Sequence, residues 1–469
     1  MKNQCFNPFL PPWEYIPDGE PHVFNDRVYL YGSHDRASGF VFCQNDYVCW
    51  SAPLDDLSDW KYEGVIYEKT NDPYNADGHM VLYAPDVCRG PDGKYYMYYV
   101  LDKVNVVSVA VCDTPAGEYK FYGYVKYSDG TKLGEKEGDE PQFDPGLLVE
   151  GERVYLYTGF CGIGDKSRTG AMATVLDRDM LTIIENPVFV APGNCNGNGT
   201  GFEGHEFFEA PSMRKIDDTY YLIYSSTPMT ELCYATSKHP TKDFKYGGVI
   251  VSNCDLNIDT YKPAEKRIYP HGNNHGSIAK IKNQWYIFYH RMTHGTWFSR
   301  QACVEKINVK PDGTIPQVEM TSLGASHKPF DGFGTYPSYI ACCLFNENGA
   351  NHENRFPKIT QEGVDDNYYE SQNCYTCYIT DIIDSTVFGY KYFDFKNAKK
   401  IDLVTRAYCR GSFEVRTSLD GKVLGSIAVV STNIWTKFSG DVNIPDGVHA
   451  LYFTYKGGGN PQLLSFSIG

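Results

Sequence analysis

Five short hydrophobic runs, rich in tyrosine, recur along the first two thirds of the chain. Their sequences are VYLY, YYMYY, VYLY, YYLIY and WYIFY, and they start at Val28, Tyr95, Val154, Tyr220 and Trp285. Consecutive starts lie 67, 59, 66 and 65 residues apart. Most runs follow a polar turn, as expected for a hairpin that enters a strand. We therefore expect a repeated unit of strand, turn and aromatic strand.

This repeated unit has the size of one propeller blade. A stretch of about 65 residues that holds several strands fits a four-stranded blade with generous loops, and five blades lie within the range that propellers adopt. A long β-sandwich or an open series of hairpins is the alternative, but neither explains the even spacing. The sequence thus predicts an all-β protein whose residues 1–325 form a five-bladed β-propeller.

Each hydrophobic run is preceded by a chemically reactive side chain at nearly the same distance. Counting back ten to twelve residues from the second residue of each run reaches Asp18, Asp86, Asp144, Glu209 and His275. Equivalent positions on the inner strands of a propeller face its axis, so we expect these side chains to form a ring.

Taken singly, these residues have ordinary structural explanations. Asp18 lies in Pro17-Asp18-Gly19 and could simply form a turn. Asp86 and Glu209 could satisfy backbone groups at strand ends, and His275 could be a hydrogen-bonded core histidine. Their shared spacing favours function, because clustered carboxylates are costly and their pKa values are perturbed. A carboxyl acid and a second carboxylate are what hydrolysis of a glycosidic bond requires.

Composition removes several other classes of function. The 469 residues carry a net charge of −15, which disfavours nucleic acid as a partner. No apolar run approaches the roughly 20 residues that cross a bilayer, so we expect no membrane association. The 15 cysteines have no regular spacing, and no secretory signal pattern opens the sequence. We therefore expect reduced thiols and a cytoplasmic protein.

Several segments resemble glycoside hydrolase family 43 over roughly residues 5–325. They are Asp18-Gly19-Glu20-Pro21-His22-Val23-Phe24, Tyr29-Leu30-Tyr31-Gly32-Ser33-His34-Asp35, Tyr83-Ala84-Pro85-Asp86-Val87, Phe208-Glu209-Ala210-Pro211-Ser212 and Asn274-His275-Gly276-Ser277-Ile278. The resemblance implies direct displacement with inversion, in which the two carboxyls stand roughly 6.5 to 9.5 Å apart to admit a water. It assigns the general base to Asp18, the general acid to Glu209, and tuning of the acid's pKa to Asp86.

The resemblance also implies supporting residues. Arg300, His34 and Asp35 are expected to bind the sugar, and His275 is expected to help hold a hydrated axial cation, which in many members of the family is calcium. Asp144 is expected to support the axial site. Glu20 is a rival for the base, because Asp18-Gly19-Glu20-Pro21 departs from the Asp-Pro-Ser of many members. No organic cofactor is expected.

Residues 326–469 show a different strand pattern, which predicts a jelly-roll-like β-sandwich. Phe413, Val415, Thr417 and Leu419 alternate with polar residues and lead to the turn Asp420-Gly421. The stretch 380–395 resembles part of a family 6 carbohydrate-binding module. Its Tyr390 and Tyr392 would either contact a glycan or belong to the core, in which case the domain is a buttress.

These observations lead to one functional hypothesis and its rivals. We expect an inverting exo-glycosidase that releases terminal α-L-arabinofuranose from arabinoxylan-type oligosaccharides. A β-D-xylosidase or a bifunctional arabinofuranosidase/xylosidase is the alternative within the class, because pocket loops such as residues 139–146 and 194–201 would select the sugar. A sugar-binding propeller without catalysis is the alternative from another class.

Overall fold

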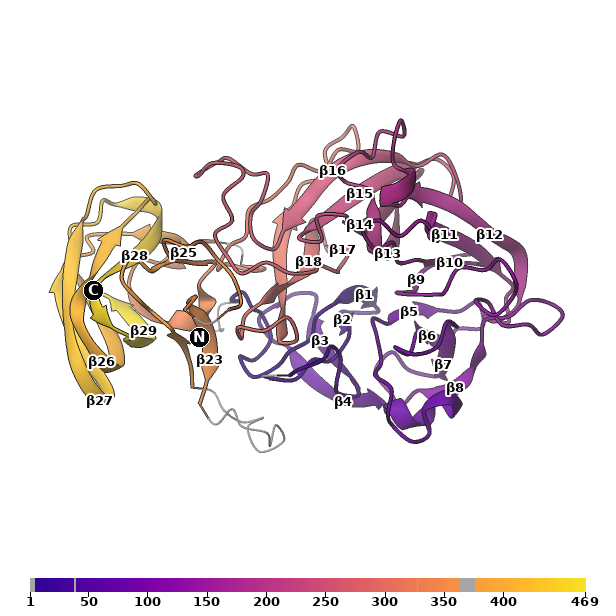
Figure 1. Cartoon of the computed structure of the whole chain (residues 1–469), viewed down its shortest axis with the longest axis horizontal. Coiled ribbons are helices and arrows are strands. Elements are labelled where there is room, and N and C mark those ends of the chain that lie inside the picture. Colours follow the sequence, from indigo (N-terminus) through magenta and orange to yellow (C-terminus); the bar gives the residue numbers. More distant parts are fainter. Residues whose placement is uncertain (1–4, 38, 327, 354, 363–375) are drawn as a thin grey trace.

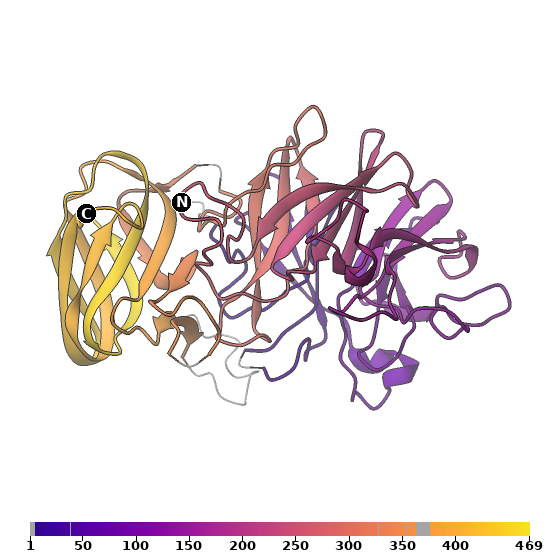
Figure 2. The ribbon, with the colours of Figure 1, turned by 45° about the horizontal axis from the view of Figure 1, so that its top comes forward.

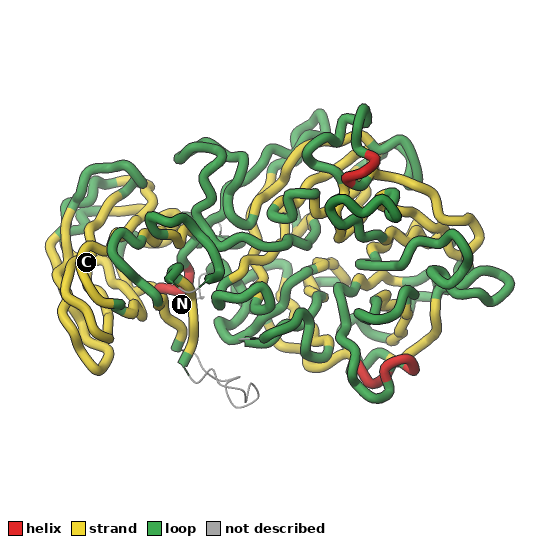
Figure 3. The backbone as a smooth tube through the Cα atoms, in the orientation of Figure 1, coloured by secondary structure: helices red, strands yellow, loops and turns green. Residues whose placement is uncertain are grey.

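The computed structural model describes residues 5–37, 39–326, 328–353, 355–362 and 376–469. In this part of the chain two β domains lie side by side, a propeller and a C-terminal sheet domain (Figures 1 and 2). Helical structure is limited to four short turns, η1 (Lys69–Asn71), η2 (Pro73–Asn75), η3 (Asn194–Asn196) and η4 (Ser338–Ile340) (Figure 3). The described residues contain no helix with the length and apolarity of a membrane span.

The propeller consists of five antiparallel sheets, one per blade. Blade 1 contains β1 (Glu20–Phe24), β2 (Arg27–Tyr31), β3 (Tyr47–Pro53) and β4 (Lys61–Tyr67). Blade 2 contains β5 (Asp86–Arg89), β6 (Tyr95–Tyr99), β7 (Ser108–Cys112) and β8 (Lys120–Tyr124). Blade 3 contains β9 (Gly146–Glu150), β10 (Arg153–Thr158), β11 (Gly170–Leu176) and β12 (Ile183–Pro192). Blade 4 contains β13 (Phe207–Ile216), β14 (Thr219–Ser226), β15 (Glu231–Ser237) and β16 (Lys245–Ser252). Blade 5 contains β17 (Ile278–Ile281), β18 (Gln284–Met292) and β19 (Arg300–Ile307).

The prediction of a five-bladed propeller is confirmed. Each of the five hydrophobic runs lies in the second strand of its blade. These strands are hydrophobic throughout because both of their faces are buried between blades. In β2, Tyr29 and Tyr31 pack in a cluster shared with blade 2, whereas Val28 and Leu30 pack in a cluster shared with blade 5.

The ring closes between blade 5 and the N-terminal segment. The backbone N–H of Phe9 donates to the carbonyl of Ala302 in β19, and Asn7 donates to the carbonyl of Ser322. A parallel bridge joins Gly19 to Gly276 beside the innermost strands. Figure 1 shows β1, β5, β9, β13 and β17 gathered around the middle of the propeller. The residues just before or at the start of these strands therefore meet at the axis.

The C-terminal domain is a curled mixed sheet with the character of a β-sandwich, as expected in coarse form. Its strands are β20 (Phe330–Asp331), β21 (Gly334–Pro337), β22 (Cys343–Phe345), β23 (Lys358–Gln361), β24 (Cys377–Thr380), β25 (Val387–Phe395), β26 (Lys400–Arg416), β27 (Gly425–Asp441), β28 (Gly447–Gly459) and β29 (Gln462–Ile468). Only β20 and β25 pair in parallel among these described strands. Tyr390 is a core residue, with its ring 4.6 Å from that of Phe466.

A buried charge joins the two domains. Lys391 of β25 places its ammonium 3.3 Å from the Asp255 carboxylate and 2.8 Å from that of Glu319, both in segments that follow propeller strands. The ring of Tyr261 lies 3.8 Å from the same ammonium, and Tyr392 donates a 2.6 Å hydrogen bond to Glu319. The C-terminal domain is thus anchored to the propeller through satisfied polar contacts as well as apolar packing.

Candidate active site

A pocket of about 530 Å³ lies at the propeller axis, and its floor carries four of the five predicted ring residues. These four are Asp18, Asp144, Glu209 and His275, from blades 1, 3, 4 and 5. The pocket is lined mainly by apolar side chains, with a few convergent polar groups, which is typical of small-molecule sites. The sequence-based expectation of a shared hollow is met for these four residues.

Aromatic rings form the walls above this polar floor. Tyr83, Phe143, Phe160 and Phe208 make an arc in which successive ring centroids lie 5.2, 5.1 and 5.2 Å apart. Phe42, Trp297 and Phe298 line the pocket as well, with Phe42 and Phe298 in edge-to-face contact at 4.8 Å. The sequence analysis missed these residues. One feature of the sequence could have indicated two of them, because Phe143 and Phe208 directly precede the ring residues Asp144 and Glu209.

Asp18 is held as an ionised carboxylate. It lies in a turn with a positive φ of 58°, a conformation that aspartate tolerates better than most residues. Its Oδ1 accepts a 2.8 Å charged hydrogen bond from Nη1 of Arg300. Burial alone would raise the pKa of Asp18, but Arg300, together with His275 and His290, brings it below its ordinary value. Asp18 is therefore suited to accept a proton.

Arg300 is fixed from behind by Asp35. Nε and Nη2 of Arg300 donate to the two oxygens of Asp35 at 2.8 and 3.0 Å, which leaves Nη1 for Asp18. Such a bidentate pair fixes the orientation of the guanidinium plane. Asp35 and His34 were expected to bind sugar, but neither belongs to the described lining of the pocket. His34 instead contacts Glu14 at 3.0 Å and the carbonyl of Asp46 at 2.8 Å.

Glu209 is turned into the pocket by a β-bulge. The pairing of β13 with β14 shifts register on both sides of Glu209, and the next residue, Ala210, has a positive φ of 64°. Bulges re-aim side chains beside active sites in this way. Burial, with a contribution from Asp18, raises the pKa of Glu209 to about 7, although His275 and Asn273 oppose the shift. Glu209 therefore retains its proton in weakly acidic solution.

Asp144 and His275 complete the charged floor. The Nδ1 atom of His275 lies 3.6 Å from Asp144 and 3.9 Å from Asp18, and its Nε2 lies 3.8 Å from Glu20. Burial opposes the charge on this imidazole, but Glu20, Asp144 and Asp18 raise its pKa to about 9. Burial and the carboxylates of Glu209 and Asp18 raise the pKa of Asp144 well above its ordinary value, against the effect of His275.

Asp86 lies one layer below the pocket and outside its described lining. It pairs with Tyr98 across the blade 2 hairpin as Glu20 pairs with Tyr31 in blade 1. Ala84, two residues earlier, lines the pocket in its place. Asp86 accepts hydrogen bonds from the backbone N–H groups of Val87 and Leu147, both at 2.7 Å, and contacts His22 at 2.6 Å. Through Leu147 of β9, Asp86 links blade 2 to blade 3.

Glu20, the rival base, is also directed away from the pocket. Its Oε2 accepts hydrogen bonds from Nη2 of Arg214 at 2.7 Å and from the Ser212 hydroxyl at 3.0 Å. Despite burial, which works in the opposite direction, Arg214 and His275 lower the pKa of Glu20 to about 2. Between the two candidates, only Asp18 reaches the pocket.

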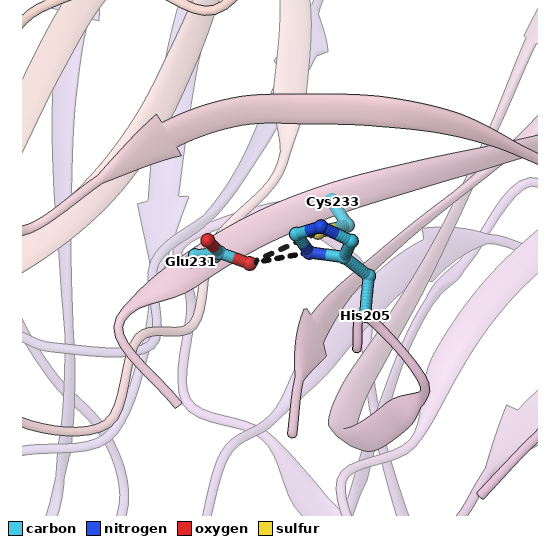
Figure 4. Close-up of side chains that lie close together, drawn as sticks. All are labelled: His205, Glu231 and Cys233. Atoms are coloured by element: carbon cyan, nitrogen blue, oxygen red, sulfur yellow. Dashed lines mark hydrogen bonds and ion pairs between the residues drawn. The ribbon is translucent and has the colours of Figure 1, made fainter. Parts of the chain in front are cut away.

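Two further clusters in the described chain have the residue types of a metal site. Glu20, His22 and Asp86 lie beneath the pocket, and His205, Glu231 and Cys233 lie in blade 4 (Figure 4). In the second cluster Oε2 of Glu231 already accepts hydrogen bonds from Ser226 at 2.9 Å and contacts His205 Nδ1 at 2.8 Å. Its other oxygen accepts a hydrogen bond from Asn257. This network explains the blade 4 cluster without an ion.

The pocket thus contains two carboxyl groups whose pKa values are shifted in opposite directions. Asp18 is ionised by its cationic neighbours, whereas Glu209 is kept protonated mainly by burial. Pairs of carboxyls whose environments push their pKa values apart are the mark of acid–base catalysis in glycoside hydrolysis. Fold and site together define a propeller hydrolase with an axial acid–base pocket.

Comparison with known proteins agrees with this class. Residues 7–315 match the family described as glycosyl hydrolases family 43. A xylosidase/arabinosidase of Thermoclostridium stercorarium is 65% identical over 476 residues, which cover 100% of this chain and 99% of the relative. The chain therefore belongs to glycosyl hydrolase family 43 and is a glycoside hydrolase, as the resemblance predicted. The family match ends before the C-terminal domain, whose likeness to a family 6 module stays a prediction.

Solved structures share the fold. An arabinoxylan arabinofuranohydrolase from Bacillus subtilis in complex with cellotetraose aligns over 98% of this chain and 97% of its own, with 20% identity and a TM-score of 0.53. A β-xylosidase/α-arabinofuranosidase from a compost microbial metagenome, in complex with xylotriose and in a calcium-free form, aligns over 67% of this chain and 97% of its own. Its identity is 24% and its TM-score 0.53.

Proposed function

We propose that this chain is an inverting exo-glycosidase that releases terminal pentose, α-L-arabinofuranose above all, from arabinoxylan-type oligosaccharides. The observation that carries the proposal is the pairing of ionised Asp18 with protonated Glu209 in one axial pocket. The 65% identical relative, named xylosidase/arabinosidase, supports a pentose substrate. The same name favours the bifunctional alternative, with β-D-xyloside as a second substrate.

The proposed reaction is a single displacement. Glu209 donates its proton to the glycosidic oxygen as the bond to the anomeric carbon breaks, and the rest of the oligosaccharide leaves as a neutral alcohol. Asp18 accepts a proton from the water that attacks the anomeric carbon from the opposite face. The pentose is released with inverted configuration, and Asp18 and Glu209 exchange protons with solvent to regain their starting states.

The third carboxyl in this proposal is Asp144 rather than Asp86. Asp144 lines the pocket, and two interacting buried carboxyls resist losing both of their protons. Glu209 is among the groups that raise the pKa of Asp144, so the two carboxyls interact. Asp86 is occupied by backbone donors and His22 below the floor. We therefore assign the tuning of Glu209 to Asp144, and a structural role to Asp86.

Arg300 is proposed to contact the sugar as well as Asp18. It lines the pocket, whereas Asp35 positions it and His34 lies elsewhere. A sugar-binding propeller without catalysis is disfavoured by the opposed pKa values of Asp18 and Glu209, because binding alone needs no protonated carboxyl. We also propose that the enzyme acts on oligosaccharides in the cytoplasm. Apart from Cys377, the cysteines in the described part of the chain are free thiols, in keeping with a reducing compartment.

An axial calcium ion is a further part of the proposal. The carboxyl groups of Glu20, Asp144 and Asp18 gather around the imidazole of His275, and carboxylate oxygens are ligands that calcium prefers. Such an ion would supply positive charge at the axis, which in its absence comes from the protonated imidazole of His275. Metal analysis of the purified protein, before and after chelation, tests this part independently of activity.

The reaction itself is tested with 4-nitrophenyl α-L-arabinofuranoside and β-D-xyloside. We expect turnover of at least one, and a loss of about 10²–10⁴-fold in the rate on an arabinoxylo-oligosaccharide when Glu209 is replaced by alanine. A folded protein that hydrolyses neither substrate would overturn the proposal. An unimpaired Glu209→Ala variant would overturn the assignment of the acid.

A further inference from the structure

A second hollow lies beside the pocket, at the junction between the propeller and the C-terminal domain. It has a volume of about 440 Å³, within the size range of ligand sites. One side is formed by residues 266–271, ahead of β17, and the other by residues 345–351 and Phe356, around and after β22. Both domains are therefore needed to form it.

Trp297 connects this hollow to the pocket. Trp297 lines the pocket, and its ring centroid lies 5.7 Å from that of His271, which lines the hollow. His352, from the C-terminal domain, packs on Trp297 at 5.0 Å and on His271 at 6.0 Å, and its Nε2 hydrogen-bonds the carbonyl of His271. Trp297 therefore lies at the border between the pocket and the hollow.

A half-buried histidine at the edge of the hollow has one unsatisfied ring nitrogen. Nδ1 of His271 is buried and has no hydrogen-bond partner among the described residues. A buried polar atom without a partner costs about 1–3 kcal/mol, so such atoms usually serve a ligand or an ordered water. Burial, helped by Arg267 and His352, lowers the pKa of His271 to about 4. The imidazole is therefore neutral near pH 7 and presents hydrogen-bonding capacity without charge.

The remaining lining suits a neutral, hydroxyl-rich molecule. Asn348 and Asn351 contribute amides, and the rings of Phe345 and Phe356 contribute flat apolar surface. The amide of Asn346 is used inside the protein, where it donates to the carbonyl of Arg355 and accepts from the backbone N–H of Asn348. The same lining contains Lys266, Arg267 and Glu347, so both signs of charge are present with one positive charge in excess. Lys266 also places its ammonium 4.7 Å from the Phe345 ring. Amides beside aromatic rings, with both signs of charge present, favour a saccharide over a phosphate or another anion.

We infer that this hollow is a distal subsite that binds the oligosaccharide chain from which the terminal pentose is cleaved. The inference rests on the proposed function, and it gives the C-terminal domain a direct part in substrate selection. Asn348 is an exposed residue of this lining and does not belong to the lining of the pocket. It is therefore the position at which the hollow can be altered with least effect on the pocket.

The test uses the full-length chain with Asn348→Ala and Asn348→Trp, which remove the amide or fill the hollow. Asn443→Ala and Asn443→Trp serve as controls, because Asn443 is an exposed residue of the same domain outside the lining of both hollows. We expect kcat/KM for an arabinoxylo-oligosaccharide to fall at least fivefold in Asn348→Trp, mainly through KM. Nitrophenyl arabinofuranoside, which occupies only the pocket and its mouth, should be hydrolysed within twofold of wild type.

Calorimetric titration with xylotetraose separates this inference from the proposed function. In a Glu209→Gln background, Asn348→Trp should weaken xylotetraose binding at least fivefold, whereas Asn443→Trp should not. Unchanged affinity, or equal losses on the aryl glycoside and the oligosaccharide, would overturn the subsite. If the wild type hydrolyses no glycoside but xylotetraose binding still depends on Asn348, the subsite stands and the proposed reaction falls. Binding of inorganic phosphate in place of xylotetraose would also overturn the inference.

Discussion

Removal of the Arg300 charge should shift the pH dependence of catalysis in a defined direction. The guanidinium Nη1 lies 2.8 Å from Oδ1 of Asp18, and both groups are buried. With charge centres about 4 Å apart and an effective dielectric constant of about 20, the attraction is worth about 4 kcal/mol. At 1.36 kcal/mol per pKa unit, this corresponds to about three units on Asp18. In Arg300→Met the base should therefore remain protonated to higher pH.

The assay is the pH profile of kcat/KM on nitrophenyl arabinofuranoside. In the wild type, the acid limb should lie below the ordinary aspartate pKa, because Asp18 is lowered, and the alkaline limb near pH 7, because Glu209 must be protonated. In Arg300→Met the acid limb should move up by about two to three pH units, which narrows the active range. Arg300 also lowers the pKa of Glu209, as a minor contributor, so the alkaline limb should move up slightly.

Arg300→Lys separates charge from sugar contact. The lysine variant keeps a cation near Asp18 but loses the paired hydrogen bonds to Asp35, so it should retain most of the low acid limb while KM rises. Arg153→Met, which alters an exposed ion pair with Glu185, should leave the profile unchanged. An acid limb in Arg300→Met that coincides with that of the wild type would refute the assignment of Asp18 as the base held ionised by Arg300.

Three further outcomes follow from the same structure. The Glu209→Gln substitution should lower kcat much more for an oligosaccharide than for a nitrophenyl glycoside, because nitrophenolate leaves without help from an acid. Equal decreases in steady-state assays would contradict the acid role. Asp144→Asn should move the alkaline limb of kcat/KM to lower pH, because the interacting pair of buried carboxyls resists losing its last proton, which Glu209 alone would lose more readily; a limb unmoved or moved upward would return the tuning role to another residue. Lys391→Met should lower the free energy of unfolding, measured by urea denaturation, by about 3–5 kcal/mol, because Asp255 is left buried without its cation. Lys437→Met, at an exposed ion pair, should change it by less than about 1 kcal/mol. Similar values for the two variants would argue against the buried ion pair as an anchor.

The repeat was visible in the sequence because every second strand is buried on both faces. Such strands must be hydrophobic throughout, and in this chain they are also aromatic, so they recur as recognisable runs such as 95–99 and 220–224. The C-terminal sheet lacks this regularity. Its strands range from two residues in β20 to 17 in β26, and its pairing depends on contacts between distant segments. Local pattern could therefore indicate β structure there but not the order of strands.

The ring of site residues was predicted only in part, because equal spacing in the sequence does not guarantee equivalent positions in the paired strands. Asp86 and Asp18 lie at nearly the same distance from their hydrophobic runs, with a difference of one residue. The hairpin register nevertheless makes Asp86 the counterpart of Glu20, below the pocket, and not of Asp18. Glu209 reaches the pocket because a bulge and the positive φ of Ala210 turn it inward. Turn lengths and bulges set these outcomes, and neither is evident from the spacing of acidic residues alone.

The roles of Asp35 and His34 show a second limit of the sequence. Both lie in a segment that resembles the family's first blade, which made them reasonable sugar contacts. In the structure Asp35 supports Arg300 and His34 pairs with Glu14, so their polar groups are already used inside the protein. A motif indicates that a residue belongs to a site, but only geometry separates a residue that contacts the ligand from one that positions its neighbour.

The anomeric configuration of the first-formed product tests the central claim most directly. Proton NMR can follow hydrolysis of a β-D-xyloside or α-L-arabinofuranoside from the first turnovers. If Asp18 activates a water while Glu209 protonates the leaving oxygen, the xyloside should release α-xylose first and the arabinofuranoside β-arabinofuranose first. Initial release of the anomer that matches the substrate would mean that a carboxylate attacks the sugar itself, which contradicts the arrangement of base and acid described for this pocket.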